Sequence, residues 1–82
     1  MKLNQIAELT KTDGDCVKVN LGSEWPWAQF VESSGDDSFI GKVTNNLVCT
    51  DEHGFSKDDK VKFRLIYDHK NKFQYFKGVE II

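Results

Sequence analysis

Short segments in which apolar and polar residues alternate recur along the chain, and turn-forming residues separate them. Strict alternation places every second side chain on the same face of a strand, so each segment predicts a half-buried β-strand. The segments span residues 16–21, 27–32, 39–44, 60–67 and 73–82. Five short strands at this spacing are typical of a small barrel or a strongly bent sheet. Gly41, inside the third segment, predicts a bulge or a sharp bend of the kind that barrel closure needs.

The same alternation predicts which side chains face the core. Val17, Val19 and Leu21 lie in phase within the first segment and should be buried together. In the last two segments, the side chains expected to face inward are Val61, Phe63, Leu65 and Tyr67, then Phe73, Tyr75, Val79 and Ile81. Phe76 and Ile82 fall on the opposite face of the last segment, so we expect this strand to be covered on both sides or to join an interface.

Length and composition predict one small domain that spans residues 1–82. The formal net charge is −2, with acidic and basic residues interleaved, which argues against a general phosphate-binding surface but leaves a local basic patch open. Cys16 and Cys49 show no metal-ligand spacing, so we expect two reduced thiols and no metal or cofactor. The chain shows neither a secretory signal nor an apolar run long enough to span a bilayer, and this predicts a cytoplasmic protein.

Four short motifs in the middle of the chain resemble those of a bacterial protein family. The motifs are Glu24-x-x-Trp27, Gly41-x-Val43-x-Asn45, Asp51-x-His53-Gly54-Phe55 and Asp59-x-Val61-x-Phe63. On these residues the chain is similar to domain-of-unknown-function family 2314 and its relatives, over about half of its length. One position departs, because Asp58 stands before Asp59 where the family pattern has glycine. The resemblance implies a small β domain in a bacterial or phage setting, and it supplies no catalytic residue.

The N-terminal segment has no counterpart in that resemblance and fits two structures. Four of its side chains share one face at helical spacing, namely Leu3, Ile6, Ala7 and Thr10. A helix this short needs packing against other elements, and a strand over residues 6–11 is the alternative. The expected fold class is therefore all-β with minor α content: a five-stranded, SH3-like or related curved barrel, with or without a short N-terminal helix.

Two clusters of reactive side chains are candidates for catalysis. Cys49 and His53 lie within five positions of each other, together with two carboxylates, so the set could act as a nucleophile with its base or bind a transition metal. Nothing in the sequence supplies an oxyanion pocket, and we prefer a buried cysteine beside a solvated loop. The adjacent pairs Asp36-Asp37 and Asp58-Asp59 are better explained by turn formation than by shared protons.

A basic row on the fourth predicted strand offers an alternative function. Cations beside aromatic side chains are typical of surfaces that bind single-stranded nucleic acid. The residues that would form such a surface here are Lys60, Lys62, Arg64, Tyr75 and Phe76. Acidic residues close by would repel phosphates, so we rank nucleic acid below a protein partner.

The tryptophans favour binding to a protein. Trp25 and Trp27 project to the same side of an extended segment, and Pro26 between them indicates a strand edge. An exposed indole there would anchor a partner, whereas the alternative buries both rings in the core. The residues that we expect to contact a partner are Trp25, Trp27, Asp51, Glu52, His53, Phe55, Asp58 and Asp59. The sequence therefore predicts a non-enzymatic protein-binding module of inhibitor or immunity type, and it leaves a homodimer open.

Overall fold

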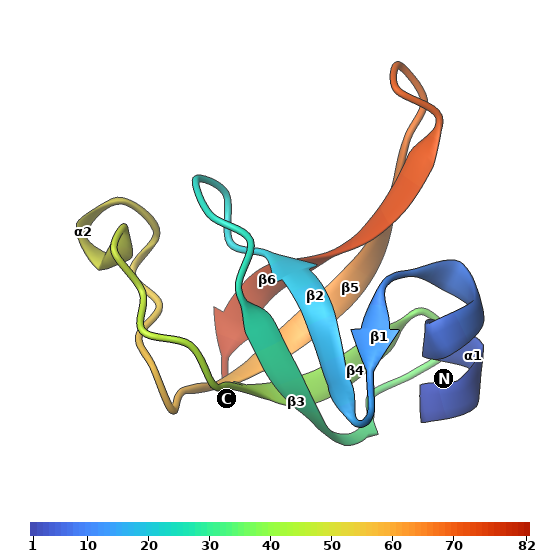
Figure 1. Cartoon of the computed structure of the whole chain (residues 1–82), viewed down its shortest axis with the longest axis horizontal. Coiled ribbons are helices and arrows are strands. Elements are labelled where there is room, and N and C mark those ends of the chain that lie inside the picture. The colour runs from blue at the N-terminus through green and yellow to red at the C-terminus, as the bar shows by residue number, and fades with distance from the viewer.

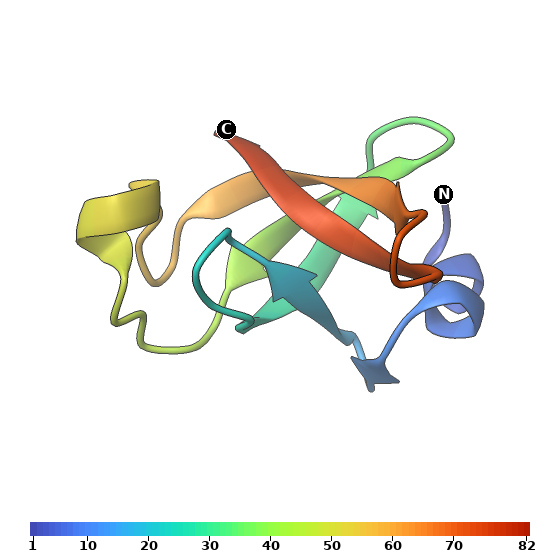
Figure 2. The ribbon, with the colours of Figure 1, turned by 90° about the horizontal axis from the view of Figure 1, so that it is seen from above.

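Five consecutive strands close into a barrel in the computed structural model, which describes all 82 residues (Figure 1). The strands are β2 (Cys16–Asn20), β3 (Trp27–Ser33), β4 (Ser38–Val43), β5 (Lys60–Asp68) and β6 (Phe73–Ile81). Neighbouring strands in this series run antiparallel, and β6 closes the barrel by pairing in parallel with β2 (Figure 2). A two-residue strand, β1 (Thr12–Asp13), adds to the outer edge of β2. The predicted fold class and all five predicted strands are confirmed.

Two short helices accompany the barrel. The helix α1 (Leu3–Leu9) is the first of the two structures that the N-terminal sequence allowed, and it begins where the Lys2 N–H donates to the Gln5 side chain at 2.8 Å. It buries Ile6 completely in the core, which provides the packing that a helix of this length requires. The helix α2 (Thr50–His53) forms one turn between β4 and β5. No helix is long and apolar enough to cross a membrane.

The barrel interior is filled by aromatic and β-branched side chains. Phe39 is the centre of the cluster, with the Phe63 ring centroid at 5.2 Å and the Phe76 centroid at 5.1 Å. Gly41 makes this arrangement possible, because a Cβ atom there would lie 2.9 Å from the Phe39 ring and 3.0 Å from the Phe63 ring. The irregularity that we expected at Gly41 lies on the neighbouring strand. Phe30 of β3 pairs with Gly41, and the register of β3 against β4 shifts directly after Phe30. Val17, Val19 and Leu21 are buried as predicted.

The predicted orientation of the last two strands is wrong in part. Four side chains that we expected to face inward are 41% to 52% exposed, namely Tyr67, Phe73, Val79 and Ile81. Phe76, which we placed on the opposite face, is completely buried. One cause is a bulge, because Lys62 pairs with Glu80 and Phe63 with Gly78, which leaves Val79 as an extra residue. The other cause is that the β5–β6 hairpin continues beyond the barrel (Figure 1), where no core exists for its side chains to enter.

Candidate functional site

A shallow groove of about 300 Å³ lies beside the start of β3. Its lining residues come from β2, the β2–β3 connection, the first residue of β3 and the segment after β4, and they are Lys18, Glu24, Trp25, Pro26, Trp27, Asn45 and Asn46. The two walls are joined by hydrogen bonds, because Asn45 Oδ1 accepts the Trp27 N–H and the Thr44 hydroxyl donates to the Trp27 carbonyl at 3.2 Å. Asn45, which follows β4, thus also fixes the position of Trp27, the first residue of β3.

Both tryptophans line this groove, and neither is a core residue. The Trp25 side chain is 43% exposed and meets the Tyr75 ring edge-on, with 5.4 Å between the centroids. Trp27 is half-buried, and Lys18 Nζ lies 5.1 Å from the centroid of its ring, within the range of a cation–π interaction. The alternative in which both indoles are buried therefore does not describe this fold, and Trp25 is the exposed indole at this position.

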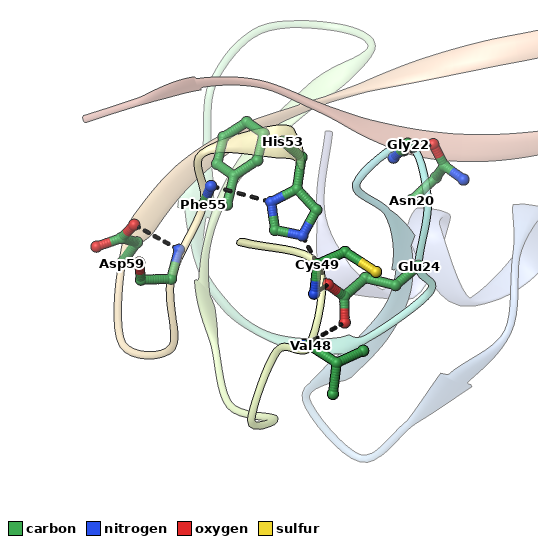
Figure 3. A network of polar contacts seen from close by, with 9 residues as sticks. Asn20, Gly22, Glu24, Val48, Cys49, His53, Phe55 and Asp59 are labelled. Atoms are coloured by element: carbon green, nitrogen blue, oxygen red, sulfur yellow. Dashed lines mark hydrogen bonds and ion pairs between the residues drawn. The ribbon is translucent and has the colours of Figure 1, made fainter. Parts of the chain in front are cut away.

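Glu24 and His53 form the centre of a polar network that ties α2 to the groove (Figure 3). The Glu24 carboxylate accepts backbone N–H groups from Val48 at 3.3 Å and Cys49 at 2.8 Å. His53 Nδ1 accepts the Phe55 N–H at 3.0 Å, so in neutral histidine the proton sits on Nε2, which donates to Glu24 Oε2 at 2.7 Å. We refer to these five residues as the Glu24–His53 network.

The electrostatics of this network follow from its hydrogen bonds. The pKa of Glu24 is lowered, chiefly because His53 donates to the carboxylate and further because the Cys49 and Val48 N–H groups do so, while desolvation opposes the change. The two side chains are mostly shielded, with 6% of His53 and 15% of Glu24 exposed. Both carboxylate oxygens and both ring nitrogens already have partners inside the chain.

The catalytic set that the sequence suggested does not assemble as a nucleophile and a base. Cys49 joins the network through its backbone N–H, and His53 has no ring nitrogen left to accept a proton from a thiol. Both cysteines are free thiols, and no three His, Cys, Asp or Glu side chains gather at a point where they could hold a metal ion. Phe55 packs partly buried against the core, with its ring 5.6 Å from the His53 ring. These residues therefore build the loop rather than a reaction centre.

The acidic side chains of the α2 loop divide into two kinds. Asp58 lies 3.9 Å from Lys42 Nζ, and Asp59 accepts the Ser56 N–H at 2.9 Å. Asp58 has a φ of 72°, the left-handed conformation that glycine and, less often, aspartate and asparagine adopt. Asp51 and Glu52 are exposed on α2 and form no ion pair. These two carboxylates are therefore without an ion-pair partner in the fold.

The nucleic-acid alternative loses one of its predicted residues. Phe76 is completely buried and cannot stack on a base, so that assignment is wrong. Lys60 and Arg64 are exposed, and Lys62 and Tyr75 are half-buried. The sequence-based nucleic-acid surface did not include three residues that lie beside Tyr75 or Arg64 in the fold, namely Trp25, Phe73 and Lys77. Trp25 was expected to contact a protein partner instead, and alternation already placed Phe73 in phase with Tyr75. The contact of Trp25 with Tyr75 follows from the closure of the barrel, and that of Lys77 with Arg64 from the register of β5 against β6, and no local pattern reports either.

Comparisons with protein-family models, curated proteins and solved structures found no match to this chain. The resemblance to family 2314 therefore stays a prediction, and any function must be argued from the residues described above.

Proposed function

We propose that this domain is a non-enzymatic module that binds a protein partner in the groove between Trp25 and Asn46. The observation that carries the proposal is the position of Trp25, a large apolar side chain that is 43% exposed at the rim of the groove. Tryptophan is among the residues that contribute most to binding energy in protein interfaces. An indole in this position can enter a pocket of the partner.

The site is held in place before any partner arrives. Pro26, between the two tryptophans in the chain, is buried, and the Tyr75 ring packs edge-on against Trp25. Glu24, which lines the groove, is fixed by the Glu24–His53 network, and Asn45 fixes the start of β3. A binding surface that loses little conformational freedom on association keeps more of its interaction energy as affinity.

The groove has the mixed chemistry that suits a polypeptide segment. Asn45, Asn46 and Lys18 offer polar groups along the same groove as the two indoles. Asp51 and Glu52, exposed on α2, would attract a partner of basic character and raise the rate of encounter. A small domain that masks a partner's surface in this way would act as an inhibitor or immunity-type protein of bacterial or phage origin. We place its action in the cytoplasm.

Affinity capture from a nuclease-treated lysate of the producing cells tests this proposal. The wild type is compared with Trp25→Ala and with a matched control, Tyr67→Ala, which removes an aromatic ring of similar exposure from the far end of the β5–β6 hairpin. We expect one protein to be captured in equal molar amount by the wild type and the control, and its affinity to fall about 30-fold in Trp25→Ala. Thermal unfolding confirms that each variant is folded.

A direct titration with the captured protein decides the outcome. Equal binding by Trp25→Ala and the wild type would remove the proposed anchor. If the captured protein is a second copy of this chain, the domain is a homodimer and the proposal of a foreign partner fails. Cys49→Ser should bind like the wild type, because the Cys49 thiol takes no part in the site.

A further inference from the structure

Two exposed aromatic rings, Phe73 and Trp25, and the half-buried ring of Tyr75 between them form a continuous row beside the outer side of β6. The Phe73 and Tyr75 centroids are 5.5 Å apart, and the Tyr75 and Trp25 centroids are 5.4 Å apart. Phe73 is 41% exposed and Trp25 is 43% exposed. Residues two apart on a strand face the same side, so Phe73, Tyr75 and Lys77 share this outer face.

Cations gather directly beside the aromatic row. Arg64 is paired opposite Lys77 across β5 and β6, and Lys62 lies two residues from Arg64 on the same face of β5. Like charges directly opposite one another destabilise a sheet, so this pair costs stability in the free protein. Asp37 alone forms an ion pair with the group, at 3.6 Å from Arg64, and both partners are mainly exposed. Lys62 and Lys77 form no ion pair.

We propose that this face binds single-stranded nucleic acid, with bases stacked on the aromatic row and phosphates on the cations. We call it the β5–β6 face and define it by Trp25, Lys62, Arg64, Phe73, Tyr75 and Lys77. A phosphate placed between Arg64 and Lys77 would relieve their mutual repulsion, and exposed rings accept bases of any sequence. This function goes beyond the proposed protein-binding role, and the two surfaces share only Trp25.

The arrangement favours nucleic acid over an acidic protein segment. Carboxylates would satisfy the cations, but they would leave the neighbouring row of rings without a flat partner, whereas each nucleotide supplies both a base and a phosphate. The net charge of −2 is not concentrated on this face, because Asp51 and Glu52 lie on α2 and Asp15 lies in the β1–β2 turn. One carboxylate, Glu80, is paired directly opposite Lys62, whereas Arg64 and Lys77 face each other. Glu80 and Asp68 mark the two ends of the β5–β6 face, and the Asp68 carboxylate already accepts N–H groups of Lys70 and Asn71.

Fluorescence anisotropy with a labelled oligothymidylate of about twelve nucleotides tests the proposal, in about 50 mM and about 200 mM salt. Contacts from three cations to phosphates predict a slope of log affinity against log salt of about −2, so binding should weaken about 18-fold across this range. Arg64→Gln/Lys77→Gln should reduce the slope to about −0.7. Tyr75→Leu should weaken binding about tenfold while the slope stays unchanged.

A matched control removes two cations away from the β5–β6 face. Lys70→Gln/Lys72→Gln makes the same change of charge in the exposed β5–β6 turn and should leave the affinity within about twofold of the wild type. Arg64→Gln/Lys77→Gln removes a repulsive pair, so this variant should remain folded, and urea unfolding verifies it.

Three results would overturn the proposal. They are the absence of binding at the lower salt concentration, an equal loss in the control, and tight binding of a polyglutamate peptide that Tyr75→Leu does not weaken. The last result would identify the face as a site for acidic protein segments. Arg64→Gln/Lys77→Gln should still capture the protein partner of the groove, so the failure of one proposal is distinguishable from the failure of the other.

Discussion

Among single residues, Glu24 shows how one side chain joins two loops that are far apart in the sequence. Its neighbours in the chain, Gly22 and Ser23, indicate a turn, and a glutamate there resembles an ordinary solvated residue. In the fold its carboxylate accepts three hydrogen bonds from residues 24 to 29 positions further along the chain. No local pattern reports such partners, because the alternation of a strand carries no information about a loop on another element.

The lowered pKa of Glu24 predicts how stability depends on pH. The folded protein holds this proton less tightly than the unfolded chain, whose glutamate pKa is about 4.3. Glu24 therefore contributes stability above that value and loses the contribution as the pH falls through the lower pKa of the folded state. We expect the free energies of unfolding of the wild type and Glu24→Gln to differ most above the pKa of the unfolded chain and to converge as the pH falls through the lower pKa of the folded state.

Urea unfolding at a series of pH values measures this difference. Glu8→Gln is the matched control, because it removes one carboxylate from an exposed position on α1. If the difference in free energy of unfolding between the wild type and Glu24→Gln is the same in strong acid as at neutral pH, the charge of the Glu24 carboxylate does not contribute to stability through the network.

At the scale of elements, α2 depends on contacts outside itself. A helix of four residues is far too short to persist alone, and α2 (Thr50–His53) has no apolar side chain to bury. Its C-terminal residue, His53, connects it to Glu24 and to the Phe55 backbone. The reactive residue types in this segment suggested catalysis as one alternative. In the fold, the same residues hold a loop against the barrel.

His53→Ala should open this loop without opening the barrel. We expect hydrogen exchange of the Val48, Cys49 and Phe55 amides, which donate to Glu24 or His53, to become faster by about tenfold or more. Amides of β4 and β5 should keep their wild-type rates. His69→Ala, which removes an exposed histidine whose ring lies edge-on to the Tyr67 ring, is the control. Equal acceleration throughout the barrel would mean that the network supports the whole domain.

For the whole molecule, closure of the barrel decides which aromatic residues form the core. The contact between β2 and β6 consists of two residue pairs, Val19 with Phe76 and Asn20 with Lys77. Phe76 enters the barrel at this point, and its ring meets Phe39 edge-on. Phe73 lies on the part of the hairpin beyond this contact and remains exposed. Closure also brings Tyr75 of the β5–β6 face against Trp25, the residue that this face shares with the groove.

Truncation of two phenylalanines on the same strand tests this account of the core. Phe76→Ala should lower the free energy of unfolding by about 3–5 kcal/mol, a large share of the stability of a small domain. Phe73→Ala should cost less than about 1 kcal/mol, because the side chain is exposed. Urea unfolding measures both, and Phe76→Leu gives a smaller loss if the alanine variant does not fold. A greater loss for Phe73→Ala would restore the orientation that alternation alone predicts.

The amino-acid pattern was sufficient to predict the order and approximate limits of the five barrel strands, because alternation of apolar and polar residues is a local property of each segment. It did not predict the two-residue strand β1. It was also sufficient to predict the burial of Val17, Val19 and Leu21, because the alternation continues without a bulge through β2 and the residue after it. The orientation of β6, the Glu24–His53 network and the contact of Trp25 with Tyr75 followed from the fold alone. A bulge reverses the alternation within a strand, the end of the barrel removes the core from beneath a hairpin, and closure joins residues about fifty positions apart. Each is a relation between elements, which the period of a single element does not contain.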